Sequence, residues 1–340
     1  MIKSRAAVLH TLNQDLIVDS LILPNNLERG QVLLQMHYSA ICGSQLGEIN
    51  GVKGEDMYLP HILGHEGIGT VLQTFKGSKK FREGDRVVAH WMKGSGLNSS
   101  SIKYFSPNRG VVNAGPIAVF GEKVIVAENR ITKIDFNGNE DLLATLGCGF
   151  FTAYGVLNYE LNLNKEIFNH ILILGFGGIG QLIYLIGSLN PKNIFSIIDN
   201  NPFAIQMAKD YLIRDIYENS NKLEVGGYTH VVDTTGVSQL IEAGYSSLGI
   251  NGEICLVGVT MKGQKISIDP MPLHYGKRIF GSYGGRINPD LDLPKITKLI
   301  EENIDHFKKL KIKKFSLDDI NIAISELQRK PNFSRAIIYF

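Results

Sequence analysis

The sequence predicts an α/β protein with two parts, a mainly β part followed by a doubly wound parallel sheet. Three observations support this fold class. After about residue 150, strands and helices alternate, which is typical of a parallel sheet with helices on both faces. A length of 340 residues also favours two domains over one. Before residue 134, short β-prone runs alternate with Gly-rich or charged breaks, and they include Val32–His37, Ile68–Gln73, Arg86–His90 and Glu122–Ala127.

After about residue 150, the sequence predicts a regular series of strands and helices. Ile171–Leu174 is a continuous apolar run, as expected for a strand buried on both faces, and a helix is expected over Gly178–Leu189. The next strand is Ile194–Ile198, after which Asn201 and Pro202 begin a helix with proline in its favoured first position. The series continues with the strands around Val231–Val232 and Ile254–Val259.

The C-terminal tail, from about Asn288, predicts two helices and a final strand over Ala336–Phe340. Ser316 and Asp319 are placed to cap the second helix, whose apolar side chains recur at helical spacing.

Composition argues against nucleic acids and membranes as partners. The chain is 44% hydrophobic and 20% charged, and its net charge is +2. Acids and bases are interleaved, so no strong field would attract a polyanion. Ile171–Leu189 has the length and apolarity of a membrane span, but its clustered glycines and its strand-turn pattern favour a buried strand and helix instead.

The cysteines predict a reducing compartment. Cys42, Cys148 and Cys255 are sparse and odd in number, which is a poor basis for disulfides in a chain of this length. We therefore expect the cytoplasm. Cys255 lies within an apolar strand and is expected to be a buried structural thiol. Met1–Leu9 lacks the apolar core and cleavage site of a secretory signal peptide.

A glycine motif lies directly between a predicted strand and a predicted helix, and it consists of Gly175, Gly177, Gly178 and Gly180. In this context the motif predicts the dinucleotide site of a Rossmann domain. The first glycine allows a tight turn, the second lets the backbone approach a pyrophosphate, and the last lets the helix pack on the strand. The helix N-terminus then faces the phosphate charge. The alternative is a Gly-rich turn without a cofactor.

Asp199 indicates which dinucleotide is bound. It lies 19 residues after Gly180, at the end of the next strand, where an acid that binds the ribose hydroxyls is expected. Between Asn200 and Ala208 there is no Arg or Lys that would neutralise a 2′-phosphate. NAD is therefore expected rather than NADP.

Several motifs in sequence order resemble the medium-chain, zinc-dependent alcohol and polyol dehydrogenases. The likeness covers nearly the whole chain. It implies a GroES-like domain over residues 1–149, completed by residues 286–340, and a Rossmann NAD-binding domain over residues 150–285, with the active site in the cleft between them. Besides the glycine motif, the matching segments are Cys42-Gly-Ser44, Gly64-His65-Glu66, Gly147-Cys148 with Thr152 and Gly155 behind it, and Phe333-Ser-Arg335.

The resemblance implies one catalytic zinc held by Cys42, His65 and Cys148, with Glu66 as an exchanging ligand or a group near the metal. Two thiolates and one imidazole suit zinc, and the open fourth position takes water or a substrate oxygen. Such a zinc acts as a Lewis acid on an alcohol hydroxyl and promotes hydride loss to NAD. Taken singly, each cysteine and the histidine is more often a core residue, but their order and glycine neighbours favour the metal site.

Further roles follow from the same resemblance. Ser44 takes the proton of the substrate hydroxyl, Thr152 packs on the nicotinamide, and Arg335 pairs with the pyrophosphate. We therefore expect Arg335→Ala to weaken NAD binding without removing zinc. His90 and Trp91 end a strand that faces the substrate in the family, and core packing is the alternative for Trp91.

Two departures from the family concern metal number and proton transfer. Many relatives carry four closely spaced cysteines that hold a structural zinc, but none occurs between His90 and Gly115, so we expect no structural zinc. Gly47 stands where some relatives have a histidine that relays the proton to solvent. The relay must end differently here, through Glu48 or water.

Two further departures concern the residues around Cys42. Gln45 stands where relatives often have Asp to orient the zinc-bound imidazole, and we expect it to accept the same hydrogen bond without the charge. Gly43 replaces an arginine that contacts phosphate in some relatives, which gives Arg335 a larger expected part in pyrophosphate binding.

The main hypothesis is a zinc-dependent oxidoreductase that passes a hydride between NAD and a secondary alcohol, polyol or sugar derivative. The alternatives are a zinc-free reductase of quinones or activated double bonds, and a catalytically silent NAD-binding protein. The ligand triple and Asp199 argue against the reductase, whereas Gln45 and Gly47 leave the silent protein open. Family relatives join through the edge of the Rossmann sheet, so the resemblance implies a homodimer or homotetramer.

Overall fold

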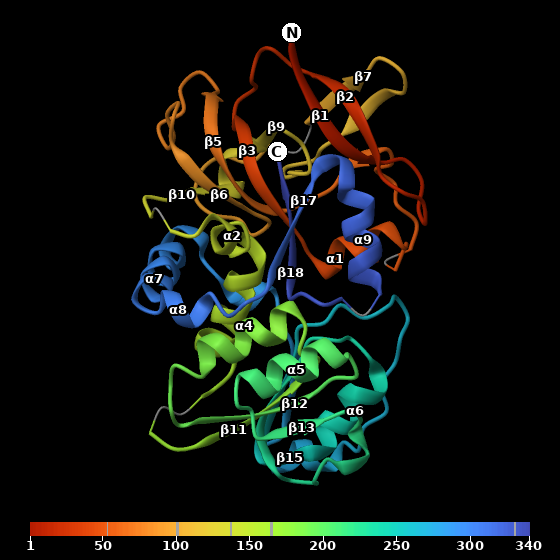
Figure 1. Cartoon of the computed structure of the whole chain (residues 1–340), viewed down its shortest axis with the longest axis vertical. Coiled ribbons are helices and arrows are strands. Elements are labelled where there is room, and N and C mark those ends of the chain that lie inside the picture. The colour runs from red at the N-terminus through yellow and green to blue at the C-terminus, as the bar shows by residue number, and fades with distance from the viewer. Residues whose placement is uncertain (53, 100–101, 137, 164–165, 330) are drawn as a thin grey trace. The chain divides into compact units, whose positions relative to one another are not determined.

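The structure is a computed structural model of the chain and describes residues 1–52, 54–99, 102–136, 138–163, 166–329 and 331–340 (Figure 1). The chain divides into two compact units. Unit 1 comprises Met1–Phe151, Asn288–Arg329 and Arg335–Phe340, and unit 2 comprises Thr152–Ile287 and Lys330–Ser334.

The short segment before the last strand belongs to unit 2, a feature that the sequence did not predict. Ser334 Oγ donates to Gln181 Oε1 at 2.6 Å, and Asn201 Nδ2 donates to the carbonyl oxygen of Pro331 at 2.9 Å. These hydrogen bonds fasten residues 331–334 to the strand-helix series of unit 2.

Unit 1 contains a small closed barrel whose strands follow the order β1-β2-β7-β8-β4. Most pairs are antiparallel, and β4 and β8 are parallel. The strands are β1 (Ile2–Leu9), β2 (Ile17–Leu23), β4 (His61–Ile62), β7 (Lys103–Ser106) and β8 (Gly110–Asn113).

A larger sheet of unit 1 positions the predicted metal ligands. Its order is β10-β6-β5-β3-β18-β17, and β9 also pairs with β3. Alternate apolar side chains of β3 are buried against neighbouring strands and form the core of this sheet. The strands are β3 (Gln31–Ile41), β5 (Glu66–Thr74), β6 (Arg86–His90), β9 (Lys123–Ala127), β10 (Ile131–Lys133), β17 (Ile312–Ser316) and β18 (Arg335–Tyr339).

The helices of unit 1 flank its strands, and the last of them packs beside β17 and β18 (Figure 1). Ser316 Oγ accepts a hydrogen bond from the backbone N–H of Asp319, which confirms the predicted cap before the helix of the tail. The helices are α1 (Gly43–Ile49), α2 (Glu140–Leu143), α7 (Pro289–Glu302), α8 (Ile304–Phe307) and α9 (Ile320–Gln328), and α3 (Phe151–Gly155) leads into unit 2.

Unit 2 is a parallel sheet in the order β13-β12-β11-β14-β15-β16, with helices between successive strands. The predicted doubly wound fold is therefore confirmed. The elements are β11 (Asn169–Leu174), α4 (Gly178–Gly187), β12 (Asn193–Ile198), α5 (Pro202–Asp210), β13 (Asp215–Tyr217), β14 (Tyr228–Asp233), α6 (Ser238–Ser247), β15 (Leu248–Leu256) and β16 (Arg278–Gly281).

Two details of unit 2 follow from local hydrogen bonds. The Asn201 side chain accepts from the N–H of Phe203 and begins α5 as predicted. The strand β15 ends at Leu256, earlier than expected, because the N–H groups of Val257 and Gly258 both turn to the carbonyl oxygen of Asp233.

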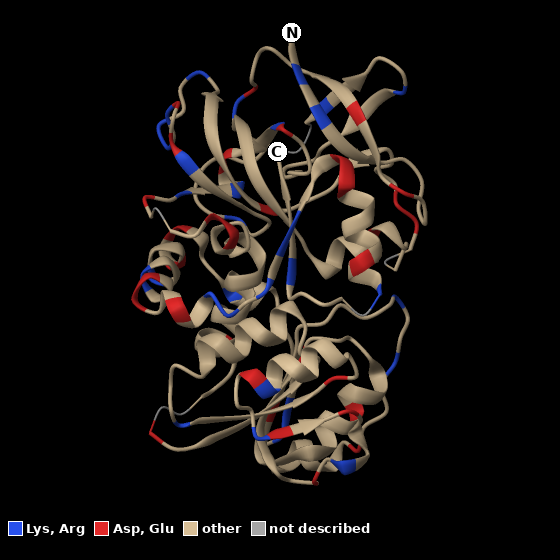
Figure 2. Ribbon diagram, viewed as in Figure 1, with Lys and Arg blue, Asp and Glu red and all other residues tan. Residues whose placement is uncertain are grey.

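The described residues include no helix that is both long and apolar enough to cross a membrane. The apolar stretch 171–189 instead contains β11, the glycine turn and α4. Lys and Arg are interspersed with Asp and Glu in each unit (Figure 2).

Candidate functional site

The three predicted metal ligands meet in unit 1. Cys42 directly follows β3 and precedes α1, His65 lies in the turn between β4 and β5, and Cys148 lies in the π-helical turn Leu146–Phe150. One possible ligand atom of each residue lies within 4.8 Å of the other two. The fold thus gathers side chains that are 23 and 83 positions apart in the sequence.

Glycines beside the ligands make this convergence possible. Gly147 passes so close to β6 that an added Cβ would lie 2.0 Å from the carbonyl oxygen of Ala89. Gly64 has a φ of +94°, and a Cβ there would lie 2.6 Å from the ring of Phe120. A larger residue at either position would push a ligand-bearing turn away from the sheet.

The ligand set fits a zinc ion. The sulfur atoms of Cys42 and Cys148 are 3.9 Å apart, close to the ~3.8 Å that two Zn–S bonds of ~2.3 Å require at a tetrahedral angle. His65 Nε2 is buried and has no hydrogen-bond partner among the described residues. An unpaired buried nitrogen beside two thiols is costly unless a further group binds there, and a cation would supply that partner.

Electrostatics in the site favour the thiolate form of Cys42. The hydrogen bond with Cys148 lowers the pKa of Cys42 well below that of an isolated thiol, and His65 adds to this effect. The same contact and burial raise the pKa of Cys148. Burial opposes protonation of His65, but the neighbouring Cys42 side chain outweighs this effect and raises the pKa of the imidazole. The thiolate form of Cys42 that these contacts favour is the form that binds a metal ion.

Gln45 contacts the site differently from expectation. Its Oε1 atom accepts a hydrogen bond from the backbone N–H of Cys42 at 2.8 Å. Its Nε2 atom, rather than an oxygen, contacts Nδ1 of His65. The prediction that Gln45 accepts from the imidazole is thus wrong for this arrangement, because its single oxygen is already used by the backbone of Cys42.

Glu66 binds the backbone of the turn that carries Cys148. It is fully buried, and its Oε2 atom accepts hydrogen bonds from the N–H groups of Cys148 and Gly149 at 3.2 and 3.1 Å. Its Oε1 atom pairs with Nη2 of Arg335. Both carboxylate oxygens bind protein groups, which favours the second of the two expected roles, a group near the metal, and the role of Glu66 stays a prediction.

Arg335 also has a partner that the sequence did not suggest. It lies at the start of β18 with only 4% of its surface exposed, and its observed ion pair is with Glu66. The buried carboxylate raises the pKa of the guanidinium despite burial. Through Glu66, this ion pair links Arg335 to the Cys148 turn. It differs from the predicted contact of Arg335 with a pyrophosphate, which stays a prediction.

Ser44 and Glu48 occupy one side of α1, four residues apart. Ser44 Oγ is buried without a hydrogen-bond partner among the described residues, so it is available to a ligand. Glu48, Asp56 and His61 form a second cluster whose oxygen and nitrogen atoms lie within 4.8 Å of one another. Asp56 and His61, which sequence reasoning missed, are 2.8 Å apart. The position of His61, four residues before the expected ligand His65, is the sequence signal that could have indicated this cluster.

His90 lies close to protein groups through both of its ring nitrogens. The side chain is fully buried, Nδ1 lies 2.7 Å from the carbonyl oxygen of Met92, and Nε2 lies 3.0 Å from Oγ1 of Thr132. Both ring nitrogens are therefore used by the protein, and burial lowers the pKa of His90 to about 4. These contacts favour a structural role for His90, and the pocket assignments of His90 and Trp91 stay predictions.

Two carboxylates bind the backbone of the loop after β6, in which the sequence has no cysteine. The N–H of Ser95 donates to Asp290 Oδ2 at 2.5 Å, and the N–H of Leu97 donates to Glu128 Oε2 at 2.9 Å. These bonds attach residues 95–97 to the rest of unit 1 through protein groups.

The glycine motif of unit 2 has the geometry of a phosphate-binding turn. Gly175 has a φ of +88°, and an added Cβ at Gly180 would lie 2.1 Å from the carbonyl oxygen of Gly175. A Cβ at Gly177 would meet nothing within 4 Å, so the backbone there is open to a ligand. Gly178 begins α4, whose N-terminus lies at this turn.

Asp199 follows β12 and lies beside the same turn. Its Oδ2 atom accepts from the N–H of Phe176 at 2.6 Å, and its Oδ1 atom accepts from the N–H of Asn201 at 2.8 Å. These bonds fix the carboxylate next to the glycine motif. Thr152, at the start of unit 2, is buried, and Cys255 is a buried thiol within β15 as expected.

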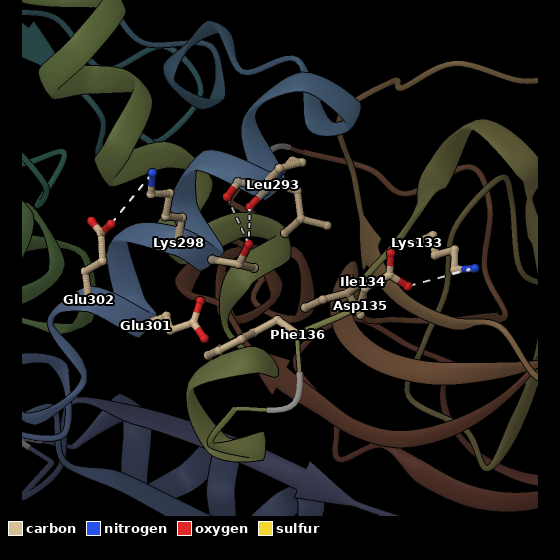
Figure 3. Close-up of a pocket in the computed structure, with 10 residues that line it drawn as sticks. Lys133, Ile134, Asp135, Phe136, Leu293, Lys298, Glu301 and Glu302 are labelled. Carbon is tan, nitrogen blue, oxygen red and sulfur yellow. Dashed lines mark hydrogen bonds and ion pairs between the residues drawn. The ribbon is translucent and has the colours of Figure 1, made fainter.

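A separate pocket of about 680 Å³ lies in unit 1 between the end of β10 and α7 (Figure 3). None of the predicted site residues lines it. Lys298 and Glu302 pair across 3.7 Å, and Lys133 and Asp135 across 3.9 Å, so its rim is partly neutralised. The pocket therefore differs in residues and in chemistry from the ligand cluster.

Comparison with known proteins agrees with this arrangement. Residues 28–136 match the family described as alcohol dehydrogenase GroES-like domain. An S-(hydroxymethyl)glutathione dehydrogenase of Escherichia coli is 24% identical over 376 aligned residues, which cover 99% of this chain and 100% of the relative.

Solved structures share the fold over the full length. Benzyl alcohol dehydrogenase from Acinetobacter calcoaceticus has a TM-score of 0.87 at 22% identity, with 100% of both chains covered. 2R,3R-butanediol dehydrogenase from Bacillus subtilis has a TM-score of 0.77 at 21% identity, with 99% of each chain covered. An acetophenone reductase from Geotrichum candidum, solved in complex with NAD, has a TM-score of 0.80 at 19% identity and covers 99% of this chain and 97% of its own.

The fold and the candidate ligand cluster are those expected of a medium-chain dehydrogenase. Residues 28–136 are similar to the alcohol dehydrogenase GroES-like domain, and the whole chain is similar in sequence and in fold to the dehydrogenases named above.

Proposed function

We propose that this protein is a zinc-dependent dehydrogenase that transfers a hydride between a small alcohol or polyol and NAD. The observation that carries the proposal is the convergence of Cys42, His65 and Cys148 around an unpaired imidazole nitrogen. The names of the relatives support a hydroxyl-bearing substrate, since two of them are dehydrogenases of benzyl alcohol and of a butanediol. Within this class, we propose a polyol or sugar derivative.

Cys42, His65 and Cys148 would hold one zinc ion. When bound, zinc supplies Lewis acidity toward a hydroxyl or carbonyl oxygen, and NAD supplies the hydride acceptor. Glu66 and Arg335 keep the Cys148 turn in place through the hydrogen bonds to its backbone. We propose no structural zinc, because the loop after β6 has no cysteine and is attached through Asp290 and Glu128.

The proton of the alcohol is proposed to leave along α1. Ser44 Oγ receives it first, since the hydroxyl is buried and free of other partners among the described residues. Glu48, one helical turn further, takes it next and passes it to the His61 ring, which Asp56 holds by a hydrogen bond. This path takes the place of a relay through a side chain at Gly47.

The cofactor is proposed to bind at Gly175–Gly180 with its ribose at Asp199. Open space at Gly177 and the N-terminus of α4 suit a pyrophosphate. The carboxylate of Asp199 would accept from ribose hydroxyls and repel a 2′-phosphate, which favours NAD over NADP. Thr152 is proposed to pack on the nicotinamide.

We also propose that the protein assembles as a homodimer or homotetramer through β16, the edge strand of unit 2. Large apolar side chains lie exposed in the segment around this edge, among them Val259, Met261, Tyr275 and Tyr283. The three free thiols fit a reducing cytoplasm.

The test is metal analysis of the purified protein combined with an NAD-coupled screen of alcohols, polyols and sugar derivatives. We expect about one zinc per chain and turnover of at least one substrate class. Cys42→Ala should lose zinc and turnover together, whereas Cys255→Ala, at a buried thiol outside the ligand cluster, should keep both. Quinone reduction with NADPH that survives removal of metal would favour the zinc-free reductase instead.

A further inference from the structure

We infer that Gln45 limits the affinity of this site for its metal, because its side chain offers one acceptor oxygen, which faces Cys42, and turns its NH₂ group to the second donor of the metal-bound form, His65. The inference rests on the proposed zinc site and concerns the strength of that site. Gln45 is a positioning residue in this account, since it acts through Cys42 and His65.

Both donors lie against the same amide. The backbone N–H of Cys42 donates to Gln45 Oε1 at 2.8 Å, and Nδ1 of His65 contacts Gln45 Nε2. Gln45 is 1% exposed, so solvent does not provide a substitute acceptor. The satisfaction of both neighbours therefore depends on this one side chain.

A cation bound at Nε2 would fix which ring nitrogen of His65 carries a proton. Nε2 is the nitrogen without a protein partner, and it needs a free lone pair to bind a cation. A neutral imidazole that binds through Nε2 must then carry its hydrogen on Nδ1. In the observed orientation this N–H would face the amide nitrogen of Gln45, which is itself a donor.

Rotation of the amide does not remove the conflict. It would bring Oε1 to Nδ1 of His65 but would turn the NH₂ group toward the N–H of Cys42. Each orientation turns the NH₂ group, itself a donor, toward one of the two buried donors, and such a contact is costly. The other tautomer of His65, with hydrogen on Nε2, satisfies both contacts but cannot bind the metal. Gln45 thus stabilises the metal-free form of the site.

A carboxylate would reverse this preference, because each of its oxygens accepts from one donor. Gln45→Glu is the closest replacement, since it exchanges the NH₂ group for an oxygen and keeps the length of the side chain. Groups that orient a metal-bound histidine typically change metal affinity by about 10- to 100-fold. We therefore expect Gln45→Glu to tighten zinc binding by about tenfold or more.

The experiment is a competition titration of zinc against a chromophoric chelator with the full-length apoprotein. It compares wild type, Gln45→Glu and Gln45→Met, and Gln14→Glu adds the same charge at an exposed position as a control. Zinc affinity is expected to be highest with Glu at position 45, lower with Gln and lowest with Met. The reason is that these side chains offer two, one and no acceptor oxygens. Thermal unfolding of each apoprotein establishes that the variants are folded, and Gln45→Asp replaces Gln45→Glu if the latter is not.

Equal or weaker zinc binding by the carboxylate variant would overturn the inference, and so would a methionine variant that binds as tightly as wild type. The proposed function fails separately, if wild type neither binds zinc nor oxidises an alcohol with NAD. A wild type that binds no zinc beside a carboxylate variant that binds it would support the inference and contradict the proposed function.

Discussion

Arg335 and Glu66 form a buried ion pair although they are 269 positions apart in the chain. Through this pair, the last strand of unit 1 holds the carboxylate that accepts hydrogen bonds from the backbone of Cys148 and Gly149. The geometry of the metal ligands therefore depends on a strand that contributes no ligand itself.

Arg335→Ala should destabilise unit 1 and weaken zinc binding, contrary to the expectation that zinc would be retained. Removal of the guanidinium leaves the Glu66 carboxylate buried without its cation, which typically costs about 3–5 kcal/mol. Urea unfolding and zinc content of the purified variant measure the two effects. Arg82→Ala, at a side chain that is 84% exposed, serves as the control and should cost less than about 1 kcal/mol. Full stability and full zinc content in Arg335→Ala would refute the supporting role.

Substitutions of two glycines in the turn between β11 and α4 should affect folding and cofactor binding differently. Gly180→Ala places a Cβ 2.1 Å from the carbonyl oxygen of Gly175, so it should lower the thermal stability of the cofactor-free protein. Gly177→Ala meets nothing within 4 Å and should leave that stability unchanged while it weakens NAD binding. Calorimetric unfolding and titration with NAD measure the two outcomes. Unaltered NAD affinity in Gly177→Ala would argue that the pyrophosphate lies elsewhere.

Glu48→Gln should slow turnover by about tenfold or more, because an amide cannot accept the proton that Ser44 passes on. A small diffusible base such as imidazole should restore part of the loss, which a purely structural role of Glu48 would not allow. Steady-state rates across pH, with and without imidazole, measure this effect. Glu55→Gln, at an exposed neighbouring carboxylate, is the control. A wild-type pH profile in Glu48→Gln would exclude this path.

His90 should make the protein less stable in acid. Burial lowers its pKa to about 4, whereas an unfolded-chain histidine titrates near pH 6.5. The unfolded chain therefore binds the proton first as pH falls, and stability is lost between about pH 6.5 and pH 4. The contribution amounts to ~2 kcal/mol between pH 7.5 and pH 5.

Urea unfolding of the zinc-free protein at these two pH values measures the effect of His90. In His90→Gln the decrease from pH 7.5 to pH 5 should be smaller by that amount, whatever the absolute stability of the variant. Identical pH dependence in the two proteins would show that His90 has the same pKa in the folded protein as in the unfolded chain.

Much of unit 2 could be predicted because its signals are local. A strand buried on both faces is apolar throughout, a proline after Asn201 favours a helix start, and the turn at Gly175 demands a positive φ. Each of these constraints acts within a few residues, so it is visible in the order of residue types. The three metal ligands were predicted by resemblance, since nothing local distinguishes a ligand cysteine from a buried one.

By itself, then, the sequence determined the two-part architecture, the dinucleotide turn and the identity of the candidate ligands. Only the tertiary structure decided the partners of the buried polar groups: Arg335 with Glu66, Gln45 between Cys42 and His65, and His90 with Thr132. The physical reason is that burial obliges a polar group to find a hydrogen-bond partner, while the choice of partner depends on which distant segments the fold brings within about 3 Å.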